Sequence, residues 1–64
     1  MDTVVNGEIW AKADHLIKRL GDEAPAYAAH HARELLDVGE TERRLYWLRV
    51  MVASKALLVR DSAA

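Results

Sequence analysis

The stretch that decides the fold is residues 41–60, TERRLYWLRVMVASKALLVR. At about 100° per residue, its apolar side chains fall on three sides of one helix, with narrow polar ridges between them. The first stripe is Leu45, Leu48, Val52, Ala56 and Val59, the second is Trp47, Met51 and Leu58, and the third is Tyr46, Val50, Ala53 and Leu57. A surface helix of a small monomer needs one broad apolar stripe. This segment therefore carries more apolar surface than a lone small fold requires.

Two shorter helices precede this segment. The first is expected over residues 7–20, with Asn6 as its N-cap and Gly21 after its last basic residues, as in helices that end with a left-handed residue. Its apolar residues recur at helical spacing: Ile9, Ala13, Leu16, Ile17 and Leu20. This pattern predicts an amphipathic helix with one face turned to the core.

The second helix is expected over residues 23–38 and is rich in alanine, the best helix former. Asp22 is the expected N-cap, Pro25 falls in the first turn, and Gly39 ends the helix. The third helix follows at residues 41–60. Because both connections are very short, neighbouring helices should be antiparallel. We predict one all-α domain over residues 1–64, a small antiparallel three-helix bundle.

Composition sets limits on stability and location. The chain has 64 residues, nine basic and ten acidic side chains, a net charge of −1 and no cysteine. A chain of this size is marginally stable, and disulfides are excluded here. The apolar runs are too short and too charged for a membrane span of about 20 residues. With no signal peptide recognisable at the N-terminus, we expect an intact cytoplasmic protein.

The surplus apolar surface of residues 41–60 suggests an interface. We expect Trp47, Met51 and Leu58 at its centre, with Tyr46 and Val50 beside them. Tryptophan is common among binding hot spots, and methionine adapts to irregular surfaces. A homodimer is the simplest partner, and a larger protein, bound as an adaptor or inhibitor would bind, is the other. The alternative is that these residues fill the chain's own core.

Catalytic and metal-binding signatures are weak. His15, His30 and His31 are the only histidines, and His30 and Glu34 share the spacing of two metal ligands on one helix face. No second pair completes such a site, so a solvated His30–Glu34 pair is the expected structure. The chain has no glycine-rich phosphate loop and no nucleophile elbow. We therefore expect no cofactor, no metal and no enzymatic activity.

Nucleic-acid binding is the alternative function. Arg43, Arg44 and Arg49, with Lys55 and Arg60, make residues 40–61 basic, and the helix–glycine–helix order resembles a helix-turn-helix. The second helix of that motif should present polar, base-reading side chains. Here apolar residues dominate the segment, and its basic residues point in three directions. Nucleic acid is thus a less favoured partner than protein.

The order of landmarks resembles a family of short helical bacterial proteins of unknown function. The resembling residues are Ile9-Trp10-Ala11, Leu16-Ile17, Gly21, Ala28, Ala32, Leu35, Gly39 and Trp47-Leu48. They span most of the chain, from about residue 8 to 58, and they are helix-packing and helix-ending positions. The resemblance implies a small helical protein that dimerises, and it assigns no activity or functional residue.

Overall fold

A computed structural model describes the backbone of residues 7–63 and the side chains of residues 7–60. This part of the chain is all-helical, which confirms the predicted fold class. It consists of α1 (Gly7–Leu20), a 3-10 turn η1 (Gly21–Glu23), α2 (Ala24–Asp37) and α3 (Thr41–Ala63). The predicted cap Asn6 lies outside the described residues.

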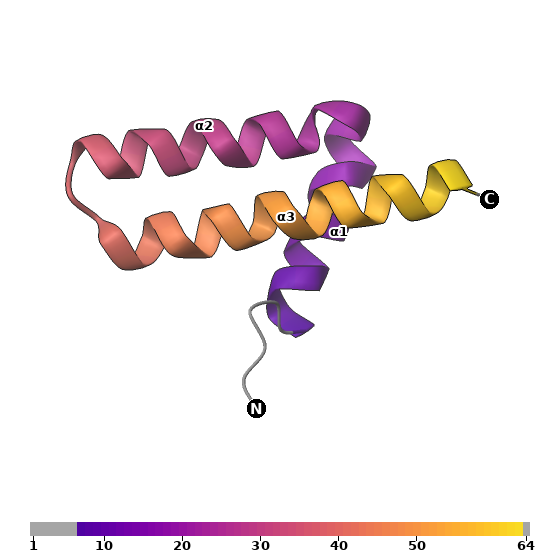
Figure 1. The fold of residues 1–64 in the computed structure, drawn as a ribbon, viewed down its shortest axis with the longest axis horizontal. Coiled ribbons are helices and arrows are strands. Elements are labelled where there is room, and N and C mark those ends of the chain that lie inside the picture. Colours follow the sequence, from indigo (N-terminus) through magenta and orange to yellow (C-terminus); the bar gives the residue numbers. More distant parts are fainter. Residues whose placement is uncertain (1–6, 64) are drawn as a thin grey trace.

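The helices form two layers. Helices α2 and α3 lie side by side as an antiparallel hairpin, and α1 crosses α3 at a steep angle (Figure 1). The predicted antiparallel arrangement therefore holds for α2 and α3, whereas α1 runs across them. The Cα atoms span 39 × 29 × 15 Å, and the shortest dimension has room for two helical layers about 8–10 Å apart. Helix α1 thus covers one face of the hairpin and leaves the other without a covering layer.

Two glycines end the first two helices, as predicted. Gly21 and Gly39 have positive φ angles of 61° and 78°, which side chains with a Cβ rarely adopt. At the end of α2 the Gly39 N–H donates to the Leu36 carbonyl at 3.1 Å, and the Glu40 N–H donates to the Leu35 carbonyl at 2.9 Å. This pair of hydrogen bonds is the Schellman motif. It turns the chain tightly enough for α3 to return beside α2.

The predicted cap at Asp22 is wrong. Asp22 lies within η1, and no side chain caps α2: its first flanking residue is Glu23, which has helical backbone angles. The Ala24 N–H instead donates to the Gly21 carbonyl. The 3-10 turn therefore supplies a backbone acceptor where a side-chain cap was expected. Pro25 does lie in the first turn of α2, as predicted.

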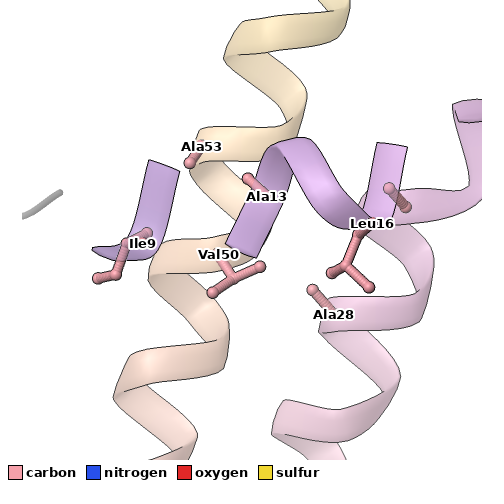
Figure 2. Close-up of a cluster of buried hydrophobic side chains, with 7 residues drawn as sticks. Ile9, Ala13, Leu16, Ala28, Val50 and Ala53 are labelled. Atoms are coloured by element: carbon pink, nitrogen blue, oxygen red, sulfur yellow. The ribbon is translucent and has the colours of Figure 1, made fainter. Parts of the chain in front are cut away.

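The core lies where α1 crosses the hairpin (Figure 2). Its buried side chains are Ile9, Ala13 and Leu16 from α1, Ala24 and Ala28 from α2, and Val50 and Ala53 from α3. Four of these seven residues are alanines, so the helix backbones approach closely and few large side chains are enclosed. A core of this size gives a small domain limited stability.

Ser54 is the buried polar residue of this region. Its side chain is fully buried, as are those of Val50 and Ala53 on the same helix. The hydroxyl donates to the Met51 carbonyl at 2.8 Å, so its polar group is satisfied within α3. The inward-facing side of α3 therefore includes Ser54 as well as Val50 and Ala53.

Candidate interaction surface

The third predicted stripe of α3 faces inward. Val50 and Ala53 are fully buried, and Tyr46 and Leu57 are half-buried against the same core. Val50 was one of the five predicted interface residues. Because its side chain is enclosed by α1 and α2 (Figure 2), it presents no surface to a partner in this fold.

Trp47, the predicted centre of the interface, packs within the chain. Its ring stacks on His31 of α2, with centroids 4.6 Å apart and planes 17° apart. Tyr27 meets it edge-on at 6.1 Å, and the Lys12 ammonium of α1 lies 5.5 Å from the ring centroid. These aromatic and cation–π contacts hold the Trp47 ring within an intramolecular cluster. Trp47 thus joins all three helices and is only partly available to a partner.

The other predicted interface residues are also half-buried. Met51 and Tyr46 pack against the core. Leu58 follows Met51 by two turns and lies on the same side of α3. Burial, and to a lesser extent the Glu8 carboxylate, raises the pKa of the Tyr46 hydroxyl above its usual value. The neutral phenol is therefore the form that the folded chain accommodates.

This raised pKa predicts a loss of stability in alkali. Between the unfolded and the folded pKa of Tyr46, the unfolded chain has released a proton that the folded chain retains, so stability falls as the pH rises above about 10. We expect the free energy of unfolding, measured by urea denaturation, to fall less between about pH 9 and pH 11 in Tyr46→Phe than in the wild type. Tyr27→Phe, in an exposed ring, is the control. An unchanged alkaline loss in Tyr46→Phe would contradict the assignment.

The exposed stripe of α3 is the first one. Val52 is 50% and Val59 66% exposed, compared with 0% for Val50. Leu45, Val52 and Val59 recur every seven residues, and half-buried Leu48 lies between the first two. This spacing is typical of a seam along which one helix packs against another. We define the outer face as these four residues together with Leu36 of α2.

Leu36 lies near this seam, because it lines the same groove between α2 and α3 as Leu48. The groove has a volume of about 410 Å³. Its lining residues are Ala29, Ala32, Arg33, Leu36, Asp37, Arg44 and Leu48. Leu36 is 55% exposed although it is a large apolar side chain. The groove joins Leu36 to Leu48, so the outer face extends over both helices of the hairpin, with the charged side chains of Arg33, Asp37 and Arg44 beside it, on the side that α1 does not cover.

The arginines proposed for nucleic-acid contact do not gather. Arg43 and Arg49 are exposed, and half-buried Arg44 lines the groove with Asp37. At about 100° per residue, the three side chains leave α3 in different directions. A duplex contacting one of them would therefore not meet the others on the same side of the helix.

The histidines form local contacts. His30 Nε2 lies 3.2 Å from Glu34 Oε2, which confirms the expected pair, and His31 Nδ1 lies 4.0 Å from Glu34 Oε1. Within residues 7–60, no three side chains of His, Asp or Glu gather as a metal site would require. In the described part of the chain, no helix has the length and apolar character of a membrane span.

The sequence did contain a signal for the outer face. The seven-residue recurrence of Leu45, Val52 and Val59 was visible, but it did not show which stripe α1 would cover. Leu36 could be added only from the structure, because it belongs to another helix. Comparison of the chain with protein-family models, curated proteins and solved structures gives no match, so the interaction surface rests on its geometry.

Proposed function

We propose that this chain is a non-catalytic interaction module that associates with a second copy of itself through the outer face. The observation that supports it is a set of exposed apolar side chains, at helix-packing spacing, on the side of the hairpin that α1 leaves open. Soluble monomers rarely expose large contiguous apolar patches, because burying such surface is favourable. A partner that covers the outer face would remove this apolar surface from water.

A second copy fits this face because the same patch can meet itself across a two-fold axis. Helix α3 has 23 residues, so it is about 35 Å long and offers a long seam. With both hairpins face to face, the outer faces become the core of a four-helix arrangement, and the two α1 helices lie on its outside. The small chain then gains the larger core that its own helices do not supply.

Charge favours one of two registers. Arg49 and Arg60 are exposed and, by helical spacing, flank the seam of α3. If α3 lay on the partner's α3, these like charges would face each other. If α3 lies on the partner's α2, Arg49 faces a helix on which Glu34 and Asp37 outweigh Arg33 by one charge. We propose the second register, with electrostatics fixing orientation more than affinity.

Val52→Asp tests this proposal. In the dimer this substitution places a carboxylate near the apolar seam in both copies, and each unpaired charge is costly to bury. We expect sedimentation velocity to show a wild-type dimer at high micromolar concentration, and a dimer dissociation constant about a hundredfold or more higher in Val52→Asp. The matched control is Ala11→Asp, at an exposed position of α1, which should remain dimeric.

Two outcomes contradict the proposal. One is a wild-type chain that stays monomeric at every concentration, which would favour a different protein as partner, in an adaptor or inhibitor role. The other is a dimer that Val52→Asp leaves intact. A DNA mobility shift that weakens steeply with salt would instead support the nucleic-acid alternative. The cytoplasmic location and the family resemblance stay predictions.

A further inference from the structure

A second surface feature lies on the opposite side of the hairpin from the outer face. It is a pocket of about 240 Å³ between the second half of α1 and the first turns of α2. Its lining residues are Lys12, His15, Leu16, Arg19, Leu20 and Tyr27. None of these residues belongs to the outer face, so the pocket is independent of the proposed self-association.

The polar side of the pocket is cationic. Lys12, His15 and Arg19 follow one another at intervals of three and four residues, so they project from the same side of α1. The lining includes no carboxylate. Among the described residues, the ion pair of α1 joins Lys18 and Asp14, which are not part of the pocket. The cationic side chains of Lys12 and Arg19, together with His15, therefore line one small space.

The remaining lining is apolar. Leu16 is buried and forms part of the core, whereas Leu20 and Tyr27 are 37% and 41% exposed. Lys12 is half-buried and lies over the Trp47 ring, a contact that restricts where its ammonium can go. The pocket thus combines two cationic side chains, Lys12 and Arg19, with the Tyr27 ring and two leucines.

We propose that this pocket binds a small organic phosphate monoester. A phosphate monoester carries a charge of about −1.5 to −2 at neutral pH, which matches the two permanent cations. Arginine and lysine are the side chains that hold phosphate oxygens by charge-assisted hydrogen bonds. The organic group of the ester lies against Tyr27, Leu16 and Leu20, so an ester should bind more tightly than inorganic phosphate.

The test is an NMR titration of the full chain with phenyl phosphate at low ionic strength. We expect saturable amide shifts confined to residues 12–20 and the start of α2, and weaker binding of inorganic phosphate. The double variant Lys12→Gln, Arg19→Gln should bind phenyl phosphate at least about tenfold less tightly. The control, Lys18→Gln with Arg43→Gln, removes the same charge outside the pocket and should bind within about twofold of wild type.

Circular dichroism checks that both double variants remain folded, which is expected because none of the four side chains is buried. Equal losses in the two double variants would show binding by net charge alone and overturn the proposal. Shifts spread over all basic residues, or inorganic phosphate binding as tightly as phenyl phosphate, would also overturn it. Because the pocket and the outer face share no residue, the Val52→Asp result leaves this test unaffected.

Discussion

Val50→Asp should abolish folding. Val50 is fully buried where α1 crosses the hairpin, and its neighbours in the core are apolar. An ionised carboxylate there would lose its hydration without gaining a partner, at a cost of several kcal/mol. A single core in a chain of this size rarely supplies more than about 3–5 kcal/mol. We therefore expect the helical circular dichroism signal and its cooperative thermal transition to disappear.

Val52→Asp is the matched control for this experiment. It makes the same chemical change two residues later, on the side of α3 that is half exposed in a lone copy. It should keep the helical signal and lose association, whereas Val50→Asp loses the fold. A folded Val50→Asp chain, or an unfolded Val52→Asp chain, would show that α3 packs on α1 and α2 through a different side.

Leu16→Ala should have the second largest effect, a loss of about 3 kcal/mol in the free energy of unfolding. Leu16 is 5% exposed and is one of only three large aliphatic side chains in the core cluster. The four alanines of the core cluster have no flexible side chains to fill the cavity that its removal leaves. Urea denaturation, followed by circular dichroism, measures the change.

Leu20→Ala provides the comparison for Leu16→Ala. Leu20 lies one turn later on α1 and is 37% exposed, so its truncation should cost less than about 1 kcal/mol. If the two variants lost equal stability, α1 would not dock through the face that carries Ile9, Ala13 and Leu16.

Much of the local structure was predictable from the sequence. Helical periodicity gave segments close to the observed α1, α2 and α3, and Gly21 and Gly39 indicated where the first two helices end. These features depend on nearby residues: backbone propensity, side-chain spacing and the freedom of glycine at positive φ. The missing cap at Asp22 is a local exception, because the Ala24 N–H donates to the Gly21 carbonyl of the 3-10 turn and not to a side chain.

The orientation of α3 was not predictable in the same way. Periodicity shows that Leu45, Val52 and Val59 share a side, but the side that becomes buried depends on where α1 crosses. Ser54 illustrates this point, because it is polar in sequence and fully buried in the fold. Trp47 likewise joined an intramolecular cluster because His31 and Tyr27 of α2 met its ring. The exposed side of α3 is therefore the first stripe, whereas the sequence had favoured the second.

The most direct test of the account is whether a second copy lies on the outer face with α3 over α2. The chain has no cysteine, so Arg49→Cys gives a single site for a nitroxide spin label beside the seam. In a mixture of spin-labelled chains with ¹⁵N-enriched chains that carry no spin label, the account predicts broadening of the α2 amides of the ¹⁵N-enriched copy. Broadening confined to α1, or no broadening between copies at high micromolar concentration, would contradict it.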